Sequence, residues 1–246
     1  MTVTAGFETQ LSVQEASSPA ATRVGRTAWQ DLSRFYVEDK ECLASFLALE
    51  LAEVLQGVKP ANLVCLTNRR RACGRNLYML WKEHGPALLE QSGLKVRVLD
   101  DRGSSILLLL YSHDALGELL AGKSVRVILK KAGYGHPDDF GAVLDELEAR
   151  VAGKGFPHEI GVFLGYPLKD VVGFMGWAPL AFTCQGPWKI FGNPEQSLRL
   201  AQCHRECRCR MSQLLVSGCS PLECLRRFAE GAADSYGAAT VFLTVS

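Results

Sequence analysis

A two-strand pattern near the middle of the chain sets the strongest limit on the fold. Residues 95–100 and 105–111 are rich in Val and Leu, and the short turn Asp101-Arg102-Gly103 separates them. Such a turn joins antiparallel neighbours, so the pattern predicts a hairpin and excludes a purely parallel sheet. The second strand holds the most continuous apolar run, ILLLLY at 106–111, which is far shorter than the roughly 20 residues that cross a membrane. We therefore expect no membrane span.

Apolar spacing elsewhere predicts helices between further strands. Apolar residues recur at three- and four-residue steps from Glu41 to Leu55, with Glu53 on the polar face, and Asn193 and Pro194 open a long helix that continues to Leu215. Strands are expected to begin near residues 61, 95, 105, 159 and 188. The predicted fold is a single α/β or α+β domain, with a mixed sheet of about five strands covered by helices. We expect a flexible N-terminal extension over 1–37, a core domain over 38–217 and a C-terminal extension over 218–246.

Charge and cysteine content limit the partners and the compartment. The chain has 27 Lys and Arg against 26 Asp and Glu, so its net charge of +1 makes nucleic acid an unlikely partner and requires any anion site to be local. The sequence begins with neither a basic leader nor an apolar stretch, so we expect no secretory signal. Nine cysteines are an odd number, which favours reduced thiols in the cytoplasm. Cys203 and Cys207 share one face of a predicted helix, but Cys209 is rotated by about 200° from Cys207, so the three cannot hold one ion and we expect no metal site there. A two-thiol site completed by Cys219 or Cys224 is the alternative.

An arginine-rich loop is the first candidate site. Arg69, Arg70, Arg71 and Arg75 lie between a predicted strand and a predicted helix, where guanidinium groups and free backbone amides suit a phosphate or carboxylate. The loop lacks the glycine spacing of a nucleotide-binding P-loop, and a solvated basic loop is the alternative reading. Cys73 lies among these arginines, which favours its thiolate and makes it a redox candidate.

The second candidate site is the segment from His158 to Asp170. In a strand, His158 and Glu159 would point to opposite faces, so they cannot act together as a dyad, although either could be a general acid or base. Tyr166, Asp170 and Lys189 would then be polar anchors. The alternatives are structural. In them, the side chains of His158 and Glu159 form hydrogen bonds with backbone groups, and Gly165 permits a tight turn that lines no ligand pocket.

Three blocks of the sequence resemble an uncharacterised bacterial protein family, a domain of unknown function found largely in anaerobes. They are FPHEIGVFLGYPLKDV at 156–171, GPWKIFG at 186–192 and GVKPANL at 57–63, and the resemblance covers roughly residues 38–212. The family more often has Val and Tyr where this chain has Ile190 and Phe191, which removes one phenolic hydroxyl. The resemblance implies iron or redox physiology and a redox partner such as a flavodoxin, but no activity and no known cofactor.

Two hypotheses follow from these observations. In the first, a cytoplasmic protein binds a small anionic ligand or cofactor where the arginine loop and the His158–Asp170 segment meet around one cavity. In the second, the chain is a protein-interaction or regulatory module without catalytic activity. A ligand site would place His158 and Asp170 in one concave pocket, whereas a docking module would bury both and bond them internally.

Overall fold

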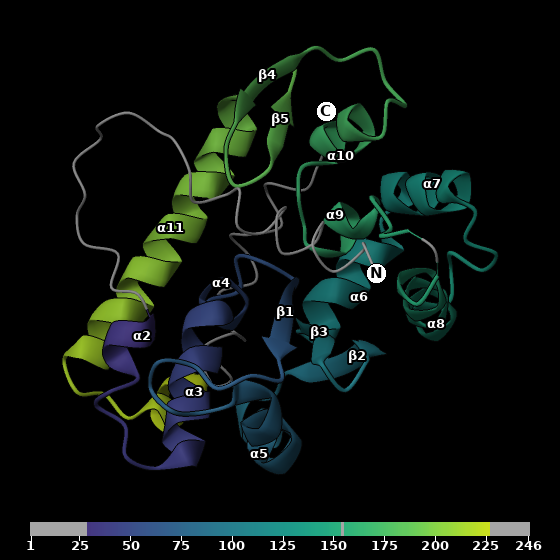
Figure 1. Cartoon of the computed structure of the whole chain (residues 1–246). Coiled ribbons are helices and arrows are strands. Elements are labelled where there is room, and N and C mark those ends of the chain that lie inside the picture. Colours follow the sequence, from purple (N-terminus) through teal and green to yellow (C-terminus); the bar gives the residue numbers. More distant parts are fainter. Residues whose placement is uncertain (1–28, 154, 227–246) are drawn as a thin grey trace.

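A computed structural model describes residues 29–153 and 155–226 as helices packed around two small antiparallel sheets (Figure 1). The larger sheet contains β1 (Ala61–Thr67), β2 (Lys95–Asp101) and β3 (Ser105–Tyr111) in the order β1-β3-β2. Both pairings are antiparallel, which confirms the hairpin, and the register shifts between Val98 and Asp100. The predicted mixed α and β class is confirmed.

The central strand β3 divides the core in two. Ile106, Leu108 and Leu110 pack into one hydrophobic cluster, while Leu107 and Leu109 pack into another on the opposite face. Successive side chains of a strand point to opposite faces, so a strand covered on both sides has no polar face. This explains why the run at 106–111 is continuously apolar.

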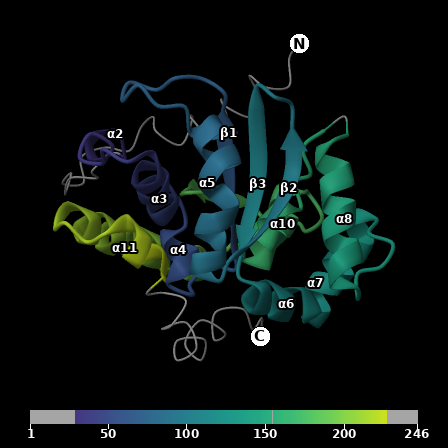
Figure 2. The same ribbon diagram turned by 90° about the horizontal axis from the view of Figure 1, so that it is seen from below.

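Helices cover both faces of this sheet, as Figure 2 shows from below. The first core is covered by α2 (Trp29–Leu32), α3 (Asp39–Glu50), α4 (Ala52–Leu55), α5 (Leu77–Ser92) and α11 (Glu195–Val216). The second is covered by α6 (His113–Ala121), α7 (Lys123–Ala132), α8 (Phe140–Val151), α9 (Ile160–Phe163) and α10 (Leu168–Phe174). The long helix α11, which the apolar periodicity predicts, runs alongside α3 and α4.

The prediction of one mixed five-stranded sheet is wrong in two respects. The segment expected as a strand at 159–164 is the short helix α9, because a brief apolar run does not by itself distinguish a buried strand from a buried helical turn. The strand near 188 is β5 (Lys189–Phe191), which pairs with β4 (Phe182–Gln185) in a separate hairpin. That hairpin packs on α10 and lies beside the N-terminal part of α11, away from the larger sheet (Figure 1).

The packed part of the chain extends beyond the boundaries expected at 38 and 217. Trp29 and Leu32 are buried in the first core, and Cys224 and Leu225 pack into the same core. The remainder of the two predicted extensions, residues 1–28 and 227–246, lies outside the described residues. In the described ranges, no helix combines the length and apolar character needed to cross a membrane.

The turn after α9 is where backbone geometry constrains the sequence most. Gly165 has a φ of +69°, and a Cβ atom placed there would lie 2.6 Å from Cδ of Pro60. Gly165→Ala should therefore lower the free energy of unfolding by about 3 kcal/mol, about 1 for the left-handed backbone and about 2 for the overlap. Chemical denaturation measures this loss.

The matched control is Gly103→Ala. Gly103 has a φ of +73°, but no atom lies within 4 Å of a Cβ placed there. This variant should lose only the backbone contribution of about 1 kcal/mol. Equal losses in the two variants would show that the Pro60 contact does not constrain the turn.

Candidate functional site

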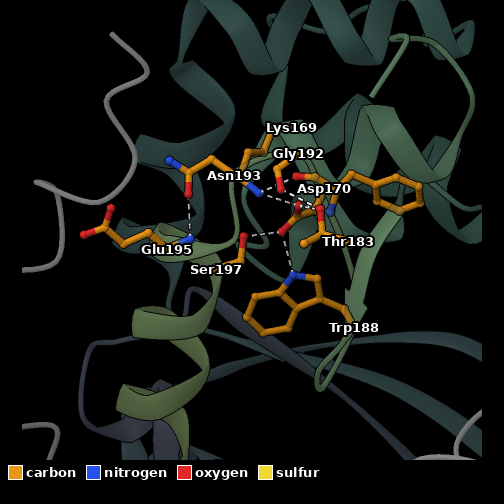
Figure 3. A network of polar contacts seen from close by, with 9 residues as sticks. Lys169, Asp170, Thr183, Trp188, Gly192, Asn193, Glu195 and Ser197 are labelled. Atoms are coloured by element: carbon orange, nitrogen blue, oxygen red, sulfur yellow. Dashed lines mark hydrogen bonds and ion pairs between the residues drawn. The ribbon is translucent and has the colours of Figure 1, made fainter. Parts of the chain in front are cut away.

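Asp170 in α10 is the centre of a buried hydrogen-bond network (Figure 3). Its side chain is 1% exposed, and Oδ1 accepts from Lys169 Nζ at 2.7 Å and from the Phe191 backbone N–H at 2.9 Å. Oδ2 accepts from Trp188 Nε1 at 2.8 Å and from Ser197 Oγ at 2.5 Å. These bonds tie α10, the β4–β5 hairpin and α11 together. Because both oxygens are fully engaged, Asp170 organises the structure around the site.

The start of α11 is fixed beside this network. Asn193 Oδ1 accepts from the Glu195 backbone N–H at 3.0 Å, which confirms the expected cap (Figure 3). Capping satisfies an N–H group that has no partner within the helix. The cap and the Ser197 bond to Asp170 together set where α11 begins and so which of its side chains face α4.

A second polar cluster adjoins the first through Trp188, and we call it the Lys59 centre. It consists of Lys59, Glu53, Tyr166, His204 and Arg208. These side chains come from α4, the turn before β1, the turn after α9, and α11. The Tyr166 ring stacks on Trp188 with a centroid separation of 4.5 Å, and the His204 ring is 5.8 Å from Trp188.

Lys59 is held inside the protein by an amide. Its residue is 7% exposed, and Nζ donates to Asn62 Oδ1 at 2.6 Å, while Asn62 Nδ2 donates to the Glu50 carbonyl at 2.6 Å. The backbone N–H groups of Val58 and Lys59 donate to the Glu53 carbonyl, which folds the turn back over the end of α4. Burial lowers the pKa of Lys59 to about 8, and the opposing attraction of Glu53 is the next largest influence.

Two buried polar atoms of the Lys59 centre have no hydrogen-bond partner within the described part of the chain. Glu53 is 3% exposed, and its Oε1 accepts from Arg208 Nε at 2.5 Å, but its Oε2 is unpartnered. His204 is 8% exposed, and its Nε2 is also unpartnered. An unsatisfied buried polar atom costs about 1–3 kcal/mol, so two in one cluster point to a polar molecule that binds there.

The protonation states give the Lys59 centre one net positive charge at neutral pH. Burial lowers the pKa of His204 to about 4 and raises the pKa of Tyr166 to about 12, so both are neutral. Lys59 and Arg208 are cationic and Glu53 is anionic, which leaves a single positive charge. A cluster of perturbed titratable groups with this balance suits a small monoanion.

His204 should make the protein sensitive to acid. Its pKa is about 4 in the folded protein against an ordinary 6.5, so the unfolded chain takes up the proton first as pH falls. The contribution of neutral His204 to the free energy of unfolding is therefore fully present above pH 6.5. It is lost as pH falls toward 4, by up to about 3 kcal/mol. Urea denaturation of wild type and His204→Gln across this range measures the difference. His136→Gln, which changes an exposed histidine, should keep the wild-type decline, and a decline that persists in His204→Gln would contradict the assignment.

The arginine loop lies at the other end of β1 from the Lys59 centre. Gly165 packs on Pro60 just before β1, whereas the loop begins at Asn68 just after it, and a strand of this length spans roughly 20 Å. The expectation that the loop and the His158–Asp170 segment meet around one cavity is therefore wrong. The physical reason is that 160–163 is a helix packed near the start of β1, not a strand whose end lies beside the loop.

Two of the four loop arginines serve internal contacts. Arg75 Nε donates to Asp39 Oδ1 at 2.7 Å, and the Arg71 guanidinium lies over the rings of Trp29 and Phe46. Arg69 and Arg70 are exposed, so anion binding by the loop stays a prediction that depends on them. Cys73 is half-buried against the first core, and its redox role likewise stays a prediction.

His158 and Glu159 are neighbours in sequence that point into different surroundings. His158 is exposed, and its ring is 5.1 Å from Phe174, over which Lys189 Nζ also lies at 5.4 Å. Glu159 is buried and accepts from Arg150 Nη1 at 3.2 Å and from Tyr134 OH at 3.4 Å. The two do not form a dyad, and His158 and Asp170 do not share a pocket.

The structure adds four site residues that sequence reasoning did not select: Lys59, Glu53, His204 and Arg208. Lys59 lies in the GVKPANL block, and His204 and Arg208 are four residues apart, which places them on one face of a helix. That spacing was an available signal for a buried polar site, because His204 and Arg208 lie on a helix face that also carries apolar residues. In the described ranges, no group of three or more His, Cys, Asp or Glu residues is arranged to hold a metal ion.

The fold and the site define an α+β protein with a buried lysine centre between the long helix α11 and the start of the larger sheet. Residues 47–225 match the family described as "Protein of unknown function (DUF3793)", so the chain belongs to that family. No curated protein and no solved structure matches the chain. The three sequence blocks noted above meet at this place: Lys59 comes from one, Tyr166 from the second and Trp188 from the third.

Proposed function

We propose that this protein binds a small molecule with a carboxylate or phosphate group at the Lys59 centre. The observation that carries the proposal is the pair of unpartnered buried atoms, Glu53 Oε2 and His204 Nε2, in two side chains that interact electrostatically with the buried ammonium of Lys59. Lys59 and Arg208 supply positive charge, and the hydroxyl of Tyr166 is a further donor. Glu53 Oε2 requires a donor in return, which a hydroxyl or amine of the ligand, or a hydroxyl formed on it after binding, supplies.

Arg208 provides the approach from solvent. Its side chain is 33% exposed, whereas that of Glu53 is 4% exposed, so the guanidinium is the part of the Lys59 centre that a ligand meets first. Among the contacts of the described residues, the guanidinium bonds to Glu53 through Nε. Its remaining N–H groups are suited to a planar oxyanion, which arginine binds through two parallel bonds.

Calorimetric titration with inorganic phosphate and with L-lactate tests the proposal. We expect the wild-type protein to bind at least one of them at pH 7, with an affinity about tenfold weaker at pH 9.5 because Lys59 then loses its proton. Lys59→Met should abolish binding, whereas Lys130→Met, which changes an exposed lysine in α7, should not. The pH dependence of binding by the wild-type protein tests the role of Lys59 without any variant. Absence of binding to both anions, or unchanged binding in Lys59→Met, would overturn the proposal.

We also propose the cytoplasm as the compartment. Cys42, Cys73, Cys203 and Cys207 are thiols, which supports a reducing environment. Alkylation of the freshly isolated, unfolded protein followed by mass spectrometry should find all of them modified without prior reduction. Modification that requires a reductant would contradict this location.

A further inference from the structure

We propose that the side chain of Lys59 forms an imine with a short 2-oxo acid, which names a substrate class for the ligand site proposed above and rests on that proposal. The inference depends on what holds the lysine, on which groups surround it, and on the charge that the Lys59 centre can neutralise.

The first observation is the nature of the group that holds the amine. Nζ of Lys59 donates to Asn62 Oδ1, and Asn62 is itself fixed by its bond to the Glu50 carbonyl. Among the described residues, no carboxylate lies within ion-pair distance of this amine. A lysine held by a neutral amide keeps its position after losing its proton, whereas a lysine in an ion pair is kept charged. The neutral amine is the form that attacks a carbonyl carbon.

The second observation is that two buried proton acceptors interact with the amine. Glu53 Oε2 and His204 Nε2 are buried without a partner, and both side chains interact electrostatically with Lys59. Imine formation moves protons from nitrogen to oxygen, and it is slow without groups that accept and return them. In the Lys59 centre, Glu53 and His204 are the groups that can do so.

The chemical step balances without an oxidant or reductant. The neutral Nζ attacks the carbonyl carbon, the C–N bond forms, and the carbonyl oxygen takes a proton to become a hydroxyl. Nitrogen then loses one proton, the hydroxyl takes up a second proton and departs as water, and nitrogen loses its remaining proton, which leaves a neutral C=N bond. One amine and one carbonyl thus give one imine and one water. The carbinolamine hydroxyl is the donor that Glu53 Oε2 requires.

The charge of the Lys59 centre selects the acid. When Lys59 is neutral, Arg208 and Glu53 balance each other, and the exposed edge of Arg208 remains to bind one carboxylate. The carbonyl must lie within reach of Nζ while the carboxylate contacts the guanidinium. A short 2-oxo acid, in which the two groups are adjacent, meets both requirements.

Reductive trapping tests the inference on the full-length protein. Wild type is incubated with pyruvate at pH 8, treated with sodium borohydride, digested and mapped by mass spectrometry. We expect a carboxyethyl group on Lys59 at a yield at least tenfold above that of any other lysine. Lys59→Arg, which keeps the positive charge but lacks the amine, should give only the background labelling of exposed lysines. Saturating L-lactate added before pyruvate should suppress the adduct.

The outcomes separate the imine from the binding site. Pyruvate that binds by calorimetry but leaves Lys59 unlabelled would overturn the imine and keep the proposed site. Labelling spread evenly over the lysines would overturn the imine as well. If neither pyruvate nor the oxyanions bind to the wild-type protein, both proposals fail.

Discussion

Asp170→Ala should lower the free energy of unfolding by about 4 kcal/mol, the largest single-residue effect that we expect. The carboxylate accepts four hydrogen bonds from Lys169, Phe191, Trp188 and Ser197. Its removal leaves the buried donors of Trp188 and Ser197 without an acceptor and Lys169 without its ion-pair partner. Breaking a buried charged network by removing one partner costs about 3–5 kcal/mol.

Equilibrium urea denaturation measures this loss, with Asp138→Ala as the matched control. Asp138 also forms an ion pair, at 2.7 Å from Arg126, but its side chain is 74% exposed. Removal of an exposed pair typically costs about 0–1 kcal/mol. If Asp170→Ala loses no more stability than Asp138→Ala, the network does not tie α10, the hairpin and α11 together.

Lys59→Met should change how stability depends on alkaline pH. The pKa of Lys59 is about 8 in the folded protein against an ordinary 10.5, so between these values the unfolded chain binds more protons. Stability therefore rises with pH in this window, and Lys59 contributes up to about 3 kcal/mol of that rise. Lys59→Met lacks this contribution. The difference in the free energy of unfolding between wild type and variant should therefore change by up to about 3 kcal/mol from pH 8 to pH 10.5.

Urea denaturation at several pH values tests this, and the difference between the two proteins removes the contribution of other titrating groups. Lys130→Met should show no such shift, because Lys130 is exposed. A constant difference between wild type and Lys59→Met across the window would mean that Lys59 is not desolvated.

The two polar clusters are connected through one tryptophan. Trp188 donates to Asp170 through Nε1, and its ring stacks on Tyr166 of the Lys59 centre. The Ser197 bond to Asp170 lies in the first turn of α11, the helix that also carries His204 and Arg208. The Asp170 network therefore fixes the geometry of the Lys59 centre although it is closed to a ligand itself.

Local chemistry explains which parts of the fold the sequence predicted. The β2–β3 hairpin follows from its turn, and α11 follows from the Asn193 cap and a long apolar period. The run of four residues at 160–163 fits a buried strand as well as a helical turn, so the sequence predicts a strand where the structure has α9. Its helical form depends on packing against α10 and on the Gly165 turn against Pro60, and neither contact is visible in local sequence.

The candidate site was predictable only in part for a similar reason. The Gly-Tyr-Pro turn marks a helix start and so points to Tyr166 and Asp170, and the structure places both at or beside the Lys59 centre. The apolar spacing places Glu53 on the polar face of its helix, yet it is buried because α11, about 150 residues later, covers it with Arg208. Burial by a distant element leaves no local signal, so the Lys59 centre could not be assembled from periodicity.

The most direct test of the central claim is the titration of Lys59 itself. NMR of protein labelled with ¹³C at lysine Cε follows each ammonium group, and the signal missing in Lys59→Met identifies Lys59. We predict a pKa near 8 for Lys59, and an upward shift when saturating inorganic phosphate stabilises the charged form. A Lys59 signal that titrates with the exposed lysines near 10.5, with and without phosphate, would contradict a buried anion-binding lysine.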